Sequence, residues 1–263
     1  TFRYRPTRDW VTGLRVVLAN GETVTARRGE VVATAGKLSF SADSGAQYEV
    51  PLPTYPWPTG KNAAGLYSAP DADLVDLFIG SEGILGVITE ATLRLAPTPE
   101  PLIGQIAFFP TEEQALAFVD DLRKAAEAGE LQVLSLEYFD PSSLEFMEHP
   151  LAQGKRGAAV AAEFAAGMDE LDALVAALEE HGSVEDWFAE SVSERQEQRK
   201  FRHSLPEGVN SYLRRHGSQK LGTDLVVPAE RFRDLIAAYR AAEEAFAERF
   251  PRAGKHLLLF GHI

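Results

Sequence analysis

The stretch DLVDLFIGSEGILGVITEATLRLAP, residues 73–97, carries glycines at every third position, at Gly80, Gly83 and Gly86. An apolar run precedes these glycines and two β-rich runs follow them. Glycines this dense disfavour a helix interior, because each costs about 1 kcal/mol there relative to alanine. They do allow sharp turns and close approach to a ligand, with free N–H groups that can hold a phosphate or a polar ring edge. On these grounds a structural turn and a ligand-binding loop are equally supported.

The spacing of the glycines does not match the common nucleotide-binding motifs. G-x-G-x-x-G fails at its second glycine, where Glu82 stands. No G-K-[ST] follows the glycines, so a P-loop is also excluded.

Residues 80–89, GSEGILGVIT, closely resemble the G-S-E-G-T-L-G-I-I-T signature of FAD-linked oxidases. That flavoprotein family includes D-lactate dehydrogenases, glycolate oxidase subunits and D-2-hydroxyglutarate dehydrogenases. Ile84 replaces the usual threonine. In the family this segment belongs to a vanillyl-alcohol-oxidase-like flavin domain, the FAD-binding PCMH type, and lies along the FAD. The resemblance therefore implies FAD as the cofactor, bound by Gly80, Ser81, Glu82, Gly83, Gly86, Ile88 and Thr89.

Length and composition indicate a globular protein of one or two domains. The chain has 263 residues, of which 45% are hydrophobic and 25% charged, and it has no cysteine. Disulfides, thiolate nucleophiles and cysteine-ligated metal centres are therefore excluded. The net charge of −13 argues against a nucleic-acid partner. No apolar run reaches the roughly 18 residues of a membrane span, so we expect a cytoplasmic protein, with peripheral membrane association as an alternative.

Residues 1–100 are expected to be the C-terminal part of an FAD-binding domain. Asn20-Gly21 separates two β-rich runs, 14–18 and 22–26, and predicts a hairpin. The hairpin resembles one in the family's flavin domain, whereas the family's upstream phosphate-binding loop has no equivalent here. Lys61 and Gly65 match a family segment that precedes the signature, although a solvated loop explains these residues equally well. The sequence is therefore expected to be truncated at both ends.

Residues 101–263 are expected to form the family's cap, or substrate, domain, incomplete at its C-terminus. The prolines of residues 96–101 predict a stiff linker. The pattern beyond it predicts strands at 103–109, 133–139 and 158–164, helices beginning at 111 and at 169, a polar helical region at 185–216, a helix at 230–250 and a strand at 256–260. The fold class is thus α+β: the second part of a flavin-binding α+β domain, followed by a ferredoxin-like α/β-sandwich cap domain with an antiparallel sheet.

Two segments resemble the family's substrate-binding motifs. FRHSLPE, residues 201–207, resembles L-R-E-x-x-P-E, whose arginine binds the substrate carboxylate, and Arg202 matches that arginine. A guanidinium suits this role because its planar fork binds a carboxylate through two hydrogen bonds, although a surface arginine is equally supported. KLGTDLVVP, residues 220–228, resembles a K-x-D-x-x-x-P strand. In the D-2-hydroxyglutarate branch the lysine two residues before the aspartate contacts substrate; here Gly222 stands there, and Lys220, displaced by two, is the candidate.

The last residues, Gly261-His262-Ile263, resemble a strand-G-H-[IV] motif that continues as G-D-G-N-L-H in the family. The two histidines of that motif bind a divalent metal beside the substrate in several members. His262 matches the first histidine and is therefore the candidate metal ligand and catalytic base. A single histidine does not form a metal site, because a catalytic zinc takes three protein ligands.

The resemblance implies an FAD-dependent oxidoreductase acting on CH–OH donors. The expected substrate is a small 2-hydroxy acid such as D-lactate, glycolate or 2-hydroxyglutarate, oxidised by hydride transfer to flavin N5. Arg202 would bind the carboxylate and His262 would take the hydroxyl proton. The expected partners are the substrate and an electron acceptor (a quinone, a cytochrome or an electron-transfer flavoprotein), with a homodimer also considered. Two alternatives stay open: a flavoprotein of the family acting on an alcohol or an ether-lipid precursor, and a non-catalytic fragment that binds a partner and no flavin.

Overall fold

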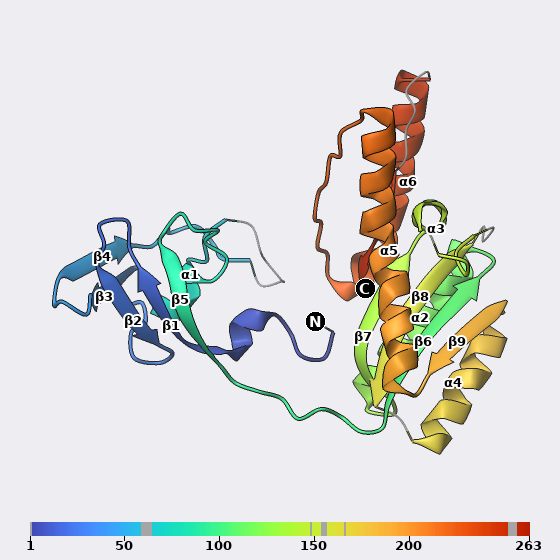
Figure 1. Ribbon diagram of the computed structural model, residues 1–263, viewed down its shortest axis with the longest axis horizontal. Coiled ribbons are helices and arrows are strands. Elements are labelled where there is room, and N and C mark those ends of the chain that lie inside the picture. The colour runs from blue at the N-terminus through green and yellow to red at the C-terminus, as the bar shows by residue number, and fades with distance from the viewer. Residues whose placement is uncertain (1, 59–64, 148, 154–156, 166, 252–256) are drawn as a thin grey trace. The chain divides into compact units, whose positions relative to one another are not determined.

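The computed structural model describes the chain except for residues 1, 59–64, 148, 154–156, 166 and 252–256, so Lys61 and His256 lie outside the described residues. The chain divides into two compact units (Figure 1). The small unit is Arg5–Pro97, and the large unit combines Thr1–Tyr4 with Thr98–Ile263. Within the described residues, no helix has the length and apolar character needed to cross a bilayer.

The small unit contains two antiparallel sheets and a short helix. The first sheet has the strand order β2-β1-β5, and the second is the hairpin of β3 and β4. The elements are η1 (Thr7–Trp10), β1 (Val11–Val17), β2 (Thr23–Arg27), β3 (Lys37–Ser41), β4 (Gln47–Pro51), α1 (Leu74–Phe78) and β5 (Val87–Leu93). The pairing of β1 with β2 confirms the hairpin predicted around Asn20-Gly21.

The glycine-rich stretch joins α1 to β5. Asp73 caps α1 by accepting a hydrogen bond from the Val75 N–H at 2.8 Å. The helix is short because the chain turns at Gly80, directly after its apolar residues. Leu74, Val75 and Phe78 pack in the core of the small unit. Burial of these α1 residues therefore fixes the position of the glycine-rich turn that follows them.

The large unit is a ferredoxin-like sandwich, which confirms the predicted fold class. Its sheet is antiparallel, with the strand order β10-β7-β8-β6-β9. The elements are β6 (Leu102–Phe109), α2 (Glu112–Ala128), β7 (Gln132–Phe139), α3 (Pro141–Phe146), β8 (Ala158–Ala165), α4 (Met168–Glu180), β9 (Glu185–Ala189), α5 (Val192–His216), η2 (Ala229–Arg231), α6 (Phe232–Arg249) and β10 (Phe260–His262). The order β6-α2-β7-β8-α4-β9 gives the β-α-β-β-α-β pattern.

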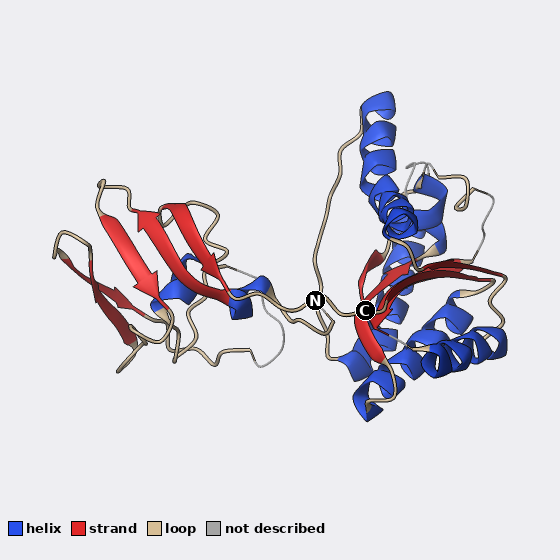
Figure 2. Ribbon diagram, turned by 60° about the horizontal axis from the view of Figure 1, so that its bottom comes forward, coloured by secondary structure: helices blue, strands red, loops and turns tan. Residues whose placement is uncertain are grey.

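Helices cover both faces of this sheet (Figure 2). On one face α2, α4 and α6 pack on the sheet through a core that includes Phe118, Leu178 and Ile236. On the other face α5 packs through Phe201 and Leu205, which are fully buried. The two apolar faces explain why the central strands β6, β7 and β8 are nearly continuous hydrophobic runs.

Three predicted elements differ from the structure. The strand predicted at 256–260 is found instead at β10, Phe260–His262, and residues 257–259 before it are irregular. Residues 185–189 form the edge strand β9, not the start of a polar helical region. Glu185 and Asp186 made this segment read as solvated, yet charged residues are typical of an exposed sheet edge. The strand expected at residues 220–228 is also absent: the segment between α5 and η2 is irregular, and Leu221 is 98% exposed. An extended segment forms a strand only where a neighbour accepts its hydrogen bonds.

Candidate active site

Arg202 and Glu137 form a two-point ion pair on the α5 face of the large sheet. The Arg202 Nε donates to Glu137 Oε2 at 2.8 Å, and Nη2 donates to Glu137 Oε1. The side chains are 26% and 15% exposed. The neighbouring Phe201 is buried against the sheet, so α5 is held at the register that brings Arg202 to β7. This fork geometry gives a stronger and more directional contact than a single ion pair.

His262 reaches the same carboxylate from the adjacent strand. In the pairing of β10 with β7, His262 lies directly opposite Glu137. Cross-strand neighbours project to the same face of a sheet. The His262 Nε2 lies 3.5 Å from Glu137 Oε1, the oxygen that also accepts from Arg202. Two of the three residues predicted to act on substrate, Arg202 and His262, are therefore brought together.

A second carboxylate lies near the guanidinium. Glu163 on β8 places Oε1 3.9 Å from Arg202 Nη1, beyond hydrogen-bond distance. Its other oxygen accepts a hydrogen bond from Ser135 Oγ at 2.8 Å. The site thus contains one guanidinium, two carboxylates and an imidazole.

The sequence interpretation missed both carboxylates. Glu137 interrupts the apolar strand 132–139 at a position that is only partly exposed, and that interruption was the available signal. A glutamate is seldom placed on a buried strand without a charged partner. The identity of that partner depends on strand pairing and on where α5 packs on the sheet, and the local sequence pattern specifies neither.

The other predicted site residues of the large unit are less supported. Lys220 lies in the exposed irregular segment after α5, whereas the described ion pairs of Arg202 are with Glu137 and Glu163. Within the described residues, no three histidine, aspartate or glutamate side chains gather closely enough to hold a metal ion. Metal binding by His262 therefore stays a prediction.

In the small unit, the predicted cofactor-binding residues Gly80, Ser81, Glu82 and Gly83 form a tight turn, whereas Ile88 and Thr89 lie in β5. Gly80, Glu82 and Gly83 have positive φ angles of 77°, 50° and 82°. The Ile84 N–H donates to the Ser81 carbonyl at 3.0 Å, which closes the turn. Ser81 itself is buried, whereas Glu82 and Gly83 are exposed.

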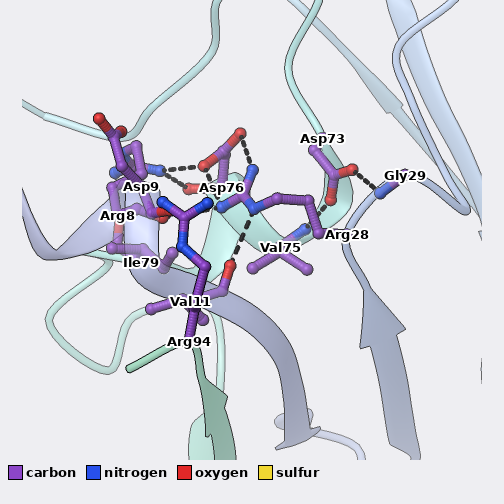
Figure 3. Close-up of polar contacts among 10 residues, drawn as sticks. All are labelled: Arg8, Asp9, Val11, Arg28, Gly29, Asp73, Val75, Asp76, Ile79 and Arg94. Atoms are coloured by element: carbon purple, nitrogen blue, oxygen red, sulfur yellow. Dashed lines mark hydrogen bonds and ion pairs between the residues drawn. The ribbon is translucent and has the colours of Figure 1, made fainter. Parts of the chain in front are cut away.

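An ion cluster fixes the base of this turn (Figure 3). Asp76 Oδ1 accepts from Arg8 Nη1 at 3.1 Å and from Arg28 Nη2 at 3.0 Å. Arg8 Nη2 also donates to the Ile79 carbonyl at 2.8 Å, immediately before Gly80. Burial favours the neutral Asp76 carboxyl, but the hydrogen bonds from Arg28 and Arg8 outweigh it and lower its pKa. The turn is therefore anchored by α1 and by two arginines from other segments.

The surface beside the turn combines open main chain with exposed apolar side chains. A Cβ at Gly83 would meet no atom within 4 Å, so the main chain there is open. Ile84 is 74% exposed, and Val87 and Ile88 are also exposed, so apolar side chains flank the open backbone. Thr89 differs, because its Oγ1 donates to the Arg15 carbonyl at 3.2 Å. Of the residues predicted to bind the cofactor, Glu82, Gly83 and Ile88 are exposed, and their contact with a flavin stays a prediction.

Close packing alone, without a cofactor, explains why residue 86 is a glycine. A Cβ at this position would lie 2.7 Å from the Val17 carbonyl oxygen and 2.8 Å from Val16 Cγ1. We expect Gly86→Ala to destabilise the small unit by about 1–3 kcal/mol through this overlap, beyond any backbone strain. The matched Gly83→Ala substitution should cost only the left-handed backbone strain of about 1–2 kcal/mol. Hydrogen exchange of the β1 amides measures both losses, and a larger loss for Gly83→Ala would contradict this explanation.

Comparison with known proteins identifies the family of the chain. Residues 103–263 match the family described as FAD linked oxidases, C-terminal domain. The chain therefore belongs to the FAD-linked oxidases, which confirms the predicted family and implies FAD as the cofactor. The small unit, which carries the glycine-rich turn, precedes the matched residues.

Individual relatives point to the same family. The glycolate oxidase subunit GlcD of Bacillus subtilis is 32% identical over 148 residues, which cover 56% of this chain and 22% of the relative. The D-2-hydroxyglutarate dehydrogenase of Xanthomonas citri pv. viticola is 28% identical over 270 residues, 99% of this chain and 46% of the relative. A solved alkyldihydroxyacetonephosphate synthase has a TM-score of 0.57 at 15% identity, covering 98% of this chain and 47% of that one, and supports the fold alone. The chain spans less than half the length of each.

Proposed function

We propose that this protein is an FAD-dependent dehydrogenase that oxidises a small 2-hydroxy acid. The observation that carries the proposal is the meeting of Arg202 and His262 at Glu137, because a carboxylate-binding group and a proton acceptor lie at one place. The names of the relatives, a glycolate oxidase subunit and a D-2-hydroxyglutarate dehydrogenase, favour the same substrate class. A hydroxy acid and an electron acceptor are the partners that such a reaction requires.

The two units have separate roles in this proposal. We assign residues 1–100 to the flavin-binding domain and residues 101–263 to the cap domain. The turn at Gly80–Gly86 would hold the flavin, with Glu82, Gly83 and Ile88 as its contact residues. The bound flavin supplies a hydride acceptor at its N5 atom.

The residues of the large unit would bind and prepare the substrate. Arg202 would donate hydrogen bonds to the carboxylate, which fixes the orientation of the acid. An imidazole nitrogen of His262 would accept the proton of the 2-hydroxyl group, since histidine exchanges protons near neutral pH. Because both groups contact Glu137, a single substrate can reach both at once.

Absorbance and turnover test the proposal. The purified protein is expected to show a flavin band at about 450 nm. With an artificial acceptor, it is expected to oxidise members of a panel of D- and L-2-hydroxy acids and to leave the matching alcohols, which lack the carboxylate, almost unreacted. A flavin-containing protein that oxidises the alcohols equally well would contradict the substrate assignment.

A further inference from the structure

Glu137 contacts both residues assigned to substrate binding, and this placement gives it a role of its own. We propose that Glu137 is a positioning residue, which holds Arg202 so that one edge of its guanidinium is kept for the substrate carboxylate. The inference rests on the proposed function and adds to it the orientation of the acid-binding group.

The guanidinium offers two edges that can each bind a carboxylate through two hydrogen bonds. Glu137 takes the edge formed by Nε and Nη2. Nη1 then points away from Glu137, and among the contacts of the described residues the carboxylate oxygen that it approaches is Glu163 Oε1, at 3.9 Å. Nη1 is therefore the donor that the ion pair with Glu137 presents to an incoming acid.

Glu163 is a second carboxylate that could pair with Arg202. One oxygen of Glu163 accepts a hydrogen bond from Ser135 Oγ, and the other faces Arg202. If Glu137 released the guanidinium, a rotation of Arg202 would close the 3.9 Å gap and form a direct ion pair with Glu163. That pair would occupy Nη1, the donor that the substrate needs. Glu137 thus competes with Glu163 for Arg202 and keeps the second edge open.

Three variants of the flavin-containing protein test this role. Glu137→Gln is expected to raise KM for a 2-hydroxy acid about tenfold, the effect of losing one charge-assisted hydrogen bond, with a smaller change in kcat. Glu137→Gln combined with Glu163→Gln removes the competing carboxylate and is expected to return KM to within about threefold of the unaltered protein. Glu197→Gln, which removes an exposed carboxylate from the same helix as Arg202, should leave KM unchanged.

Binding measured without turnover separates this role from the function itself. 2-Hydroxyisobutyrate has no hydrogen on its hydroxyl-bearing carbon, so it can bind as an analogue that is not oxidised. Its dissociation constants, measured by calorimetry, should rank the variants in the same order as their KM values. The role of Glu137 alone is contradicted if the unaltered protein binds the analogue but Glu137→Gln binds it equally or more tightly. It is also contradicted if the double variant binds as weakly as Glu137→Gln. No binding to the unaltered, folded protein would contradict the proposed function and this role together.

Discussion

In the Arg202→Met variant, kcat/KM for a 2-hydroxy acid is expected to fall about 10²- to 10³-fold. Removing one partner of a largely buried charge pair typically costs about 2–5 kcal/mol, and the expected loss of 10²- to 10³-fold lies in the middle of that range. The loss is expected mainly in KM, because the carboxylate is bound both before and during the reaction. Steady-state kinetics over a range of acid concentrations measure it.

A conservative variant and a matched control make this result specific. Arg202→Lys keeps the charge but loses the planar fork, and is expected to lose about tenfold to a hundredfold in kcat/KM. Arg199→Met removes an exposed arginine from the same helix and should retain full activity. Oxidation of an alcohol that lacks the carboxylate should not depend on Arg202. An equal loss on acid and alcohol would show that Arg202 supports the fold and not the substrate.

Replacing Arg240 by methionine is expected to destabilise the large unit by about 3–5 kcal/mol. Arg240 Nη2 donates to Glu112 Oε1 at 2.6 Å and to Asp140 Oδ2 at 2.9 Å. The Asp140 side chain is 0% exposed and also caps α3. Burial disfavours the charged form of Arg240, but the hydrogen bonds that it donates to Glu112 and Asp140 outweigh this effect and raise its pKa. The methionine would therefore leave a buried carboxylate without its partner.

Arg233 provides the control for Arg240, because it lies on the same helix and also pairs with acids of α2. It binds Glu113 and Asp120, but its side chain is 41% exposed. Exposed ion pairs contribute about 0–1 kcal/mol, so Arg233→Met should have little effect. Hydrogen exchange of the β7 and β8 amides, measured at increasing urea concentration, gives the free energy of unfolding of the large unit separately from that of the small unit. Equal losses in the two variants would contradict the importance given to burial.

Much of the fold could be predicted because its signals are local. The strands 102–109, 132–139 and 158–165 are buried on both faces and therefore read as apolar runs of strand length. The hairpin at Asn20-Gly21 was marked by its turn residues. The strand β9 was missed because it is short, charged and at the sheet edge. The residues 220–228 were assigned to a strand from resemblance, but strand formation depends on a neighbour that no local pattern reveals.

The candidate site could be predicted only in part, for the same reason. Arg202 and His262 were found one by one, each from a short motif that it matches. Their meeting depends on the pairing of β10 with β7 and on the packing of α5, which are long-range features. Glu137 lies at the point where these features converge, so its role became visible only with the structure.

The most direct measurement is a crystal structure of the flavin-containing protein with 2-hydroxyisobutyrate bound. We expect the carboxylate to accept hydrogen bonds from Arg202, including one from Nη1. The hydroxyl group should lie within hydrogen-bond distance of His262, and the pair of Arg202 and Glu137 should be retained. An acid bound to other residues, while Arg202 and His262 contact only Glu137 and its neighbours, would contradict the proposed roles of both residues.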